Sequence, residues 1–249
     1  IQKFNVKKIF LDSYPQESSL SGNTSPEANK ALIKNINEGA LVVNYTGHGG
    51  ELGWSEEKIL LVNHIHKMKN RNNLALFMTA TCEFSRFDDP SHISAGEHLI
   101  LQKAGGAIAL FTTVRLVFSI PNFKLNKTFY SILNESITNQ NTKLGDVFRL
   151  TKVKNNGGTN DRNFTLLGDP ALKLSFPLMD VKVDNIKINN TKTDTLKALS
   201  IPSIIGHIEN NQGILQGDYN GWAEVKIYDK KRDKTTLDND NNGINFRWF

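Results

Sequence analysis

Residues 41–50 (LVVNYTGHGG) and 74–84 (LALFMTATCEF) decide the fold of this chain. Each opens with a continuous apolar run, the pattern of a buried parallel strand rather than of an alternating, half-solvated one. The first ends at His48, which lies between glycines, and the second at Cys82, the only cysteine. Neighbouring parallel strands would bring both side chains to one carboxyl edge, where open α/β sheets bind ligands.

The first 177 residues alternate between strand and helix patterns, which predicts an α/β fold with a mostly parallel sheet and helices on both faces. Ser25 is placed as an N-cap and Pro26 as the first residue of a helix that ends before Gly39. The predicted strands are 6–12, 41–43, 74–78, 107–111 and 171–174. The predicted helices are 26–37, 55–68, 96–104, 122–134 and 143–155.

The pattern changes after Pro177, so we predict two domains, 1–177 and 178–249. Residues 181–188, 204–208 and 223–228 alternate apolar and polar side chains between Asn/Gly turns, as half-solvated antiparallel strands do. We expect the start of an Ig-like β-sandwich, truncated because the segment is too short for seven strands. Ile1 is not a methionine, and we expect an internal piece of a longer protein, so that the lack of a signal peptide means little.

Composition excludes several classes of protein. No segment approaches the roughly 20 apolar residues of a membrane helix. The net charge is +5, but the lysines are scattered and form no stripe with aromatic residues, so we expect no nucleic-acid partner. A single cysteine excludes an intrachain disulfide framework and a cysteine-based zinc site, and we predict no metal ligands among the site residues.

A thiol beside an imidazole makes a cysteine nucleophile with its base. An ordinary thiol is only about 3% thiolate at pH 7, and an adjacent imidazole can pair with the thiolate or accept its proton. The backbone amides of Gly49 and Cys82 are placed to donate to a developing oxyanion. The predicted reaction is acyl transfer through a thioester.

Other interpretations of these residues stay open at this point. Cys82 alone has the properties of a small buried hydrophobe, and His48 those of a turn residue. Trp54 is expected to pack under the His48 loop, with substrate contact as the alternative. Residues 86–89 offer acceptors for calcium or form a solvated loop, and Glu97 with Arg115 is a candidate buried pair that braces the loops.

The linked segments NYTGHGG (44–50) and TATCEFSRFDDP (79–90) resemble the gingipain family of cysteine peptidases, in the caspase-like clan. The resemblance implies that His48 is the base and Cys82 the nucleophile, with the Gly49 and Cys82 amides as oxyanion donors. It also implies a third, carboxylate member upstream, for which Asp12 is the only candidate here. The chemistry needs no cofactor, although structural calcium occurs in the family.

Segments SAGE (94–97), GAIALFTTVR (106–115), NFTLLGDP (163–170), TLKAL (195–199) and IYDKK (227–231) look more narrowly like the sortase branch of that family, which serves type IX secretion. This resemblance implies a protein at the cell surface, associated with the outer membrane. Its partners would be exported cargo with C-terminal signal domains, other secretion components and a lipopolysaccharide-type amine anchor. A secreted endopeptidase that only hydrolyses and a non-catalytic secretion scaffold are the alternatives.

Overall fold

The computed structural model describes residues 4–20, 22–138, 141–196, 198–210, 212–222, 225, 227, 232–237, 239 and 245–248. The chain divides into two compact units, Ile1–Leu174 together with Lys230–Phe249, and Ser175–Asp229. The domain division at residue 177 stays a prediction, and each unit is described by itself.

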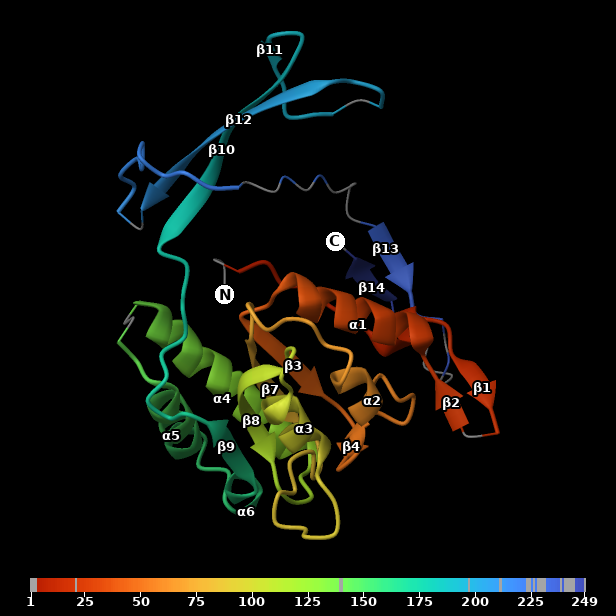
Figure 1. Ribbon diagram of the computed structural model, residues 1–249. Helices are drawn as coiled ribbons and strands as arrows, with labels where there is room; N and C mark the ends of the chain where they lie inside the picture. Colours follow the sequence, from red (N-terminus) through yellow and green to blue (C-terminus); the bar gives the residue numbers. More distant parts are fainter. Residues whose placement is uncertain are drawn as a thin grey trace. The chain divides into compact units, whose positions relative to one another are not determined.

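The first unit is built on a sheet of strand order β3-β7-β8-β9 (Figure 1). Strands β3 (Val42–Thr46), β7 (Ala75–Ala80) and β8 (Ala107–Thr113) run parallel, and β9 (Phe164–Gly168) runs antiparallel to β8. All six residues of β7 are buried, as its continuous apolar run predicts for a central strand. The mostly parallel α/β sheet is therefore confirmed.

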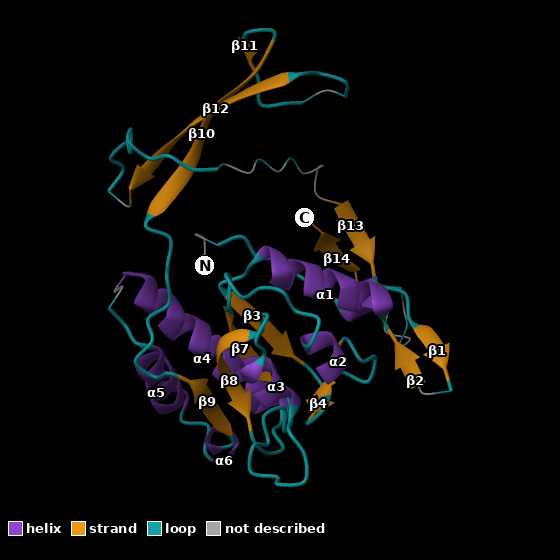
Figure 2. Cartoon of the chain, in the orientation of Figure 1, coloured by secondary structure: helices purple, strands orange, loops and turns teal. Residues whose placement is uncertain are grey.

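Helices cover both faces of this sheet, as Figure 2 shows. Leu110 of β8 belongs to the core that includes Ile36 of α1 (Pro26–Glu38) and Leu99 of α3 (Ala95–Leu101). The next residue, Phe111, points the other way. Its ring centroid lies 5.5 Å from that of Phe129 in α4 (Ser119–Thr138) and 4.5 Å from that of Phe148 in α5 (Leu144–Asn155). Successive strand residues face opposite sides, so one strand supplies both cores.

The helices are α1 (Pro26–Glu38), α2 (Val62–Ile65), α3 (Ala95–Leu101), α4 (Ser119–Thr138), α5 (Leu144–Asn155) and α6 (Thr159–Arg162), with a 3₁₀ turn η1 (Leu11–Ser13). Helix α1 begins at the predicted proline, and Gly39 ends it with a φ of 104°, which a side chain would strain. The predicted helices near 96–104, 122–134 and 143–155 correspond to α3, α4 and α5.

Three predicted elements are wrong. Residues 6–10 are not a strand; Ser13 donates its amide and hydroxyl to the Phe10 carbonyl and closes the η1 turn instead. Residues 55–61 are not helical, because Ser55 and Lys58 take φ values of 57° and 56° in a turn between strands. Residues 171–174 are not a strand, since Asp169 folds them into a turn by accepting from the Ala171 amide, and the last sheet strand is β9.

The segment after β3 forms a small antiparallel sheet, with strand order β4-β5-β6. Its strands are β4 (Gly49–Gly50), β5 (Gly53–Trp54) and β6 (Leu60–Leu61). Two hairpins complete the described part of the first unit: β1 (Glu17–Ser19) with β2 (Gly22–Thr24), and β13 (Arg232–Thr235) with β14 (Asn245–Trp248). No helix within the described ranges is long and apolar enough to cross a membrane.

The second unit contains an antiparallel sheet of order β11-β10-β12. Strands β10 (Met179–Ile188) and β12 (Pro202–Asn210) include the predicted strands at 181–188 and 204–208, and β11 (Thr191–Lys192) adds a short edge. Most of the predicted strand at 223–228 lies outside the described residues. The described strands form one sheet, and the Ig-like sandwich stays a prediction.

Candidate functional site

The register of β3 against β7 brings the segments that carry His48 and Cys82 to the same carboxyl edge of the sheet. Thr46 pairs with Ala80 at the end of the parallel ladder, and the Gly47 amide donates to the Ala80 carbonyl at 3.5 Å. His48 and Cys82 each lie two residues beyond that last pair. The Gly49 backbone also lies close to the Thr81 side chain, because a Cβ added at Gly49 would meet Thr81 Oγ1 at 2.6 Å.

The backbone of His48 is held from two sides while its ring stays exposed. Its carbonyl accepts from the Tyr45 hydroxyl at 2.6 Å and from the Ser55 amide at 2.8 Å. Burial raises the pKa of Tyr45, with the negative charge of Glu57 adding to the effect, so its phenol stays a neutral donor. The Tyr45 ring stacks on Trp54, with 4.5 Å between centroids and 5° between planes.

Trp54 is a packing residue. It is 1% exposed and also lies against Phe77 and Phe84, with 6.0 and 5.6 Å between ring centroids. A side chain so enclosed has no surface to offer a substrate. The structure therefore supports the packing interpretation and corrects the alternative of direct contact.

Cys82 is half-buried at the start of a tightly constrained loop. Its thiol donates to the Val117 carbonyl at 3.4 Å. The Thr113 hydroxyl donates to the Thr81 carbonyl, and Glu83 takes a φ of 50°. The thiol thus faces Val117 here, and rotation about its Cα–Cβ bond would release it; catalytic hydrogen bonds often tighten only when substrate binds.

The two predicted oxyanion donors have amides free to serve. Because Ser55 N donates to His48 O, Gly49 and Trp54 form a non-hydrogen-bonded pair of the ladder, and the Gly49 amide points away from β5. Among the hydrogen bonds of the described residues, none uses the Cys82 amide. Both N–H groups therefore remain for a ligand at the edge that carries His48 and Cys82.

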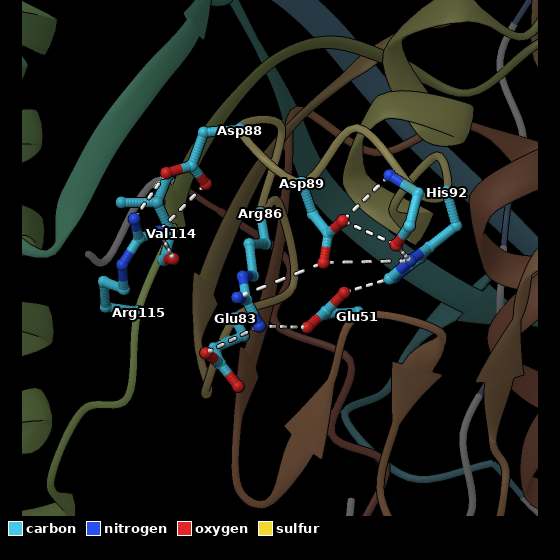
Figure 3. A network of polar contacts seen from close by, with 9 residues as sticks. Glu51, Glu83, Arg86, Asp88, Asp89, His92, Val114 and Arg115 are labelled. Carbon is cyan, nitrogen blue, oxygen red and sulfur yellow. Dashed lines mark hydrogen bonds and ion pairs between the residues drawn. The ribbon is translucent and has the colours of Figure 1, made fainter.

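Glu51 links the loop after His48 to the loop after Cys82 (Figure 3). Its Oε1 accepts from Arg86 Nη1 at 2.8 Å, and its other oxygen contacts His92 Nε2. Its carbonyl accepts from the Ala95 amide at 2.6 Å. The hydrogen bond from Arg86 to Glu51 raises the pKa of Arg86 above its ordinary value. The two segments that carry the predicted chemistry are thus cross-linked by polar contacts.

The acidic loop at 88–89 does not fit a calcium ion. Arg115 binds Asp88 through both guanidinium nitrogens and lowers its pKa, and Ser91 donates to Asp89 and lowers that pKa too. Glu51, Asp89 and His92 come close enough to hold a metal, with ligand atoms within 4.8 Å of one another. Calcium takes six to eight oxygen ligands, however, and Arg86 already occupies part of this group.

Two further sequence predictions do not survive in their original form. Asp12 lies in η1, and its carboxylate accepts from the Asn239 amide at 2.9 Å rather than from His48. Glu97 does not pair with Arg115; it caps α3 by accepting from the Ser94 amide and hydroxyl at 2.9 and 2.7 Å. Neither carboxylate is placed to orient the His48 ring.

Sequence reasoning missed three contributors to the site: Glu51, Val117 and Thr113. Glu51 directly follows the glycines of the His48 loop, and Arg86 lies four residues after Cys82. A carboxylate and an arginine in these two positions could have suggested an ion pair between the two loops. The role of Val117 rests on its carbonyl, which no side-chain pattern reveals.

One protein-family model, Peptidase family C25, matches residues 1–175. The chain belongs to peptidase family C25. No curated protein matches the sequence.

Two solved structures of this family's gingipain type share the fold. The crystal structure of the Arg-specific cysteine proteinase gingipain R (RGPB) aligns with a TM-score of 0.53 and 20% identity, over 75% of this chain and 50% of that one. The complex of the RgpB pro- and mature domains from Porphyromonas gingivalis aligns with a TM-score of 0.52 and 17% identity, over 88% of this chain and 56% of that one. The C25 chain described here thus spans about half the length of these relatives.

Proposed function

We propose that this C25 chain carries the nucleophile and base of a gingipain-like cysteine peptidase, with Cys82 and His48 in those roles. The observation that supports this most strongly is that both residues follow the same carboxyl edge of the sheet. His48 lies two residues after Thr46 and Cys82 two residues after Ala80, which form the last pair of β3 and β7. Nothing else in the first unit combines a thiol with an exposed imidazole, since Cys82 is the only cysteine.

In the proposed reaction, Cys82 Sγ bonds to a substrate carbonyl carbon while His48 takes the thiol proton. The Gly49 and Cys82 amides donate to the oxyanion of the tetrahedral intermediate. The C–N bond then breaks, the leaving amine takes the proton from His48, and a thioester remains on Cys82. Positioned proton transfer of this kind contributes about 10²- to 10⁴-fold in rate. Water or a second amine then attacks the thioester.

We further propose that the parent protein is a PorU-like sortase of type IX secretion at the cell surface. It would remove the C-terminal signal domain of cargo and transfer the new carboxyl end to an amine of a lipopolysaccharide-type anchor. The support is the set of linked motifs at 44–50, 79–90, 94–97, 106–115 and 163–170, in that order along one chain. A sortase must let an amine outcompete water at about 55 M, which requires a positioned acceptor.

A secreted endopeptidase with the same dyad is the alternative, because both reactions share the thioester. A non-catalytic secretion scaffold is the third possibility, and the intact pair of His48 and Cys82 argues against it. Structural calcium in the parent protein stays a proposal, to which the group of Glu51, Asp89 and His92 gives no support.

The decisive experiment is mass spectrometry of cargo C-termini from cells with the full-length parent, wild type against Cys82→Ala. A sortase predicts an added amine-linked group in the wild type and unprocessed cargo in the variant. Free carboxyl ends in the wild type would indicate a peptidase that only hydrolyses. Identical ends in both strains would remove Cys82 from the chemistry.

A further inference from the structure

Four exposed apolar side chains belong to the segment in which Val117 contacts the Cys82 thiol. Leu116, Phe118, Ile120 and Phe123 are 62, 72, 82 and 68% exposed, all within eight residues. We refer to these four as the apolar strip. Large exposed apolar clusters on a folded surface mark binding sites more often than chance placement does.

The strip is tied directly to the thiol. Val117 is 7% exposed, and its carbonyl is the acceptor of the Cys82 thiol at 3.4 Å. Leu116 and Phe118 flank it, so their side chains point outward on either side of a residue whose backbone touches Sγ. Consecutive Cα atoms are about 3.8 Å apart, so Leu116 and Phe118 each lie one residue from the acceptor of the thiol, within reach of a substrate held at Cys82.

The backbone of the strip is fixed while its side chains are left to solvent. Asn163 Nδ2 donates to the Leu116 carbonyl at 2.8 Å, and the Phe118 amide donates to Asn160 Oδ1 at 2.9 Å. Asn160 in turn donates to Asn122 Oδ1 at 3.2 Å. These anchors hold the apolar surface in place before a ligand arrives, which reduces the entropy that a ligand must overcome.

The carboxylates that follow Cys82 within residues 83–89 all contact arginine side chains. Arg86 lies 3.6 Å from Glu83 and 4.0 Å from Asp89, and Arg115 is paired with Asp88 through both nitrogens. Asp88 is therefore paired with an arginine of its own, whereas Arg86 is shared by Glu51, Glu83 and Asp89.

From this geometry we infer that the apolar strip is the specificity surface for the reaction of Cys82. It selects peptides with a large apolar side chain within two residues of the scissile bond. This inference rests on the proposed function, and it concerns the substrate class that function leaves open.

The test uses the full-length parent protein and fluorogenic peptides randomised at the two positions on each side of the scissile bond. We expect peptides with Leu, Phe or Met at one of these positions to be cleaved best. Burying such a side chain against the strip corresponds to about a 10- to 100-fold gain in kcat/KM over alanine.

Leu116→Ser and Phe118→Ser should each lose about 10-fold or more of that preference, mainly through KM. Leu101→Ser is the matched control, because Leu101 is equally exposed (69%) but ends α3 toward the opposite, amino edge of the sheet. All three positions are exposed, so folding should be unaffected. Alkylation of Cys82 by iodoacetamide, a small uncharged reagent, should keep its wild-type rate in every variant.

A preference for basic residues, or an unchanged apolar preference in both strip variants, would overturn the inference and leave the proposed function standing. The inference would also be overturned if the strip variants lost binding to lipid vesicles but kept the wild-type peptide preference. That result would assign the strip to a lipid surface. If no peptide is cleaved and peptide electrophiles fail to label Cys82, the proposed function falls, and this inference falls with it.

Discussion

Gly49 offers the sharpest test of how the His48 and Cys82 loops are held. A Cβ at this position would lie 2.6 Å from Thr81 Oγ1 and 2.8 Å from the Gly53 carbonyl oxygen. Ordinary contact begins near 3.4 Å, so Gly49→Ala is short of space by about 0.8 Å on the Thr81 side. Because one contact is with backbone, side-chain rotation alone cannot relieve the clash.

The Gly49 backbone must therefore shift by a sizeable fraction of an ångström away from Thr81 and from the Gly53 carbonyl of β5. Overpacking of this kind typically costs about 1–3 kcal/mol of stability. A misplacement near 1 Å between reacting groups can cost about 10²-fold in rate. We expect Gly49→Ala to lower kcat/KM by roughly that factor while the protein remains folded.

Gly50→Ala is the matched control, since a Cβ at the next residue meets nothing within 4 Å. Urea unfolding measures the stability loss, and peptide cleavage measures the rate. The double variant Gly49→Ala with Thr81→Ala removes the closer contact and should recover part of both losses. If Gly49→Ala matches Gly50→Ala in both stability and cleavage rate, the close contact between Gly49 and Thr81 is wrong.

Three further predictions concern the support of the site and the second unit. Trp54→Ala should destabilise the first unit by about 3–5 kcal/mol in urea unfolding, because the ring is 1% exposed and stacked on Tyr45; an effect below 1 kcal/mol would contradict its packing role. Thr113→Val leaves the buried Thr81 carbonyl without its hydroxyl donor, and should lower the free energy of unfolding by about 1–3 kcal/mol. The amides of the Cys82 loop should also exchange hydrogen faster, and unchanged exchange in that loop would contradict the prediction. Hydrogen bonds with Asp184 and Glu209 raise the pKa of His207 above its ordinary 6.5. That stabilisation is fully present below about pH 6.5 and is lost as pH rises through the raised pKa. Protection of the β10 and β12 amides, taken relative to the intrinsic exchange rate at each pH, should therefore fall at high pH in wild type but not in His207→Gln.

The sequence predicted the centre of the sheet because its signal there is local and strong. The continuous apolar runs at 41–43 and 74–78 predict strands of a parallel sheet covered on both faces. They correspond to β3 and β7. The placement of His48 and Cys82 at one edge follows from parallel pairing alone. Helix α1 was equally readable, since Pro26 and Gly39 mark its two ends.

The failures share a different origin, which is competition from turns. Apolar residues at 6–12 and 171–174 fit a strand, but Ser13 and Asp169 hydrogen-bond to nearby backbone and fold those segments locally. Residues 55–61 have the composition of a helix, but Ser55 and Lys58 adopt the left-handed backbone conformation, which interrupts a helix. The Glu51–Arg86 link joins residues 35 apart in the sequence, and no periodicity reveals such a pair.

We propose that Cys82 is a nucleophile activated by His48. The most direct measurement is labelling of the full-length protein with a peptide acyloxymethyl ketone, followed by intact mass and peptide mapping. We expect one thioether, on Cys82, absent in Cys82→Ala and formed about 10²- to 10⁴-fold more slowly in His48→Ala. Labelling at the wild-type rate in His48→Ala, or none on Cys82 in the wild type, would contradict it.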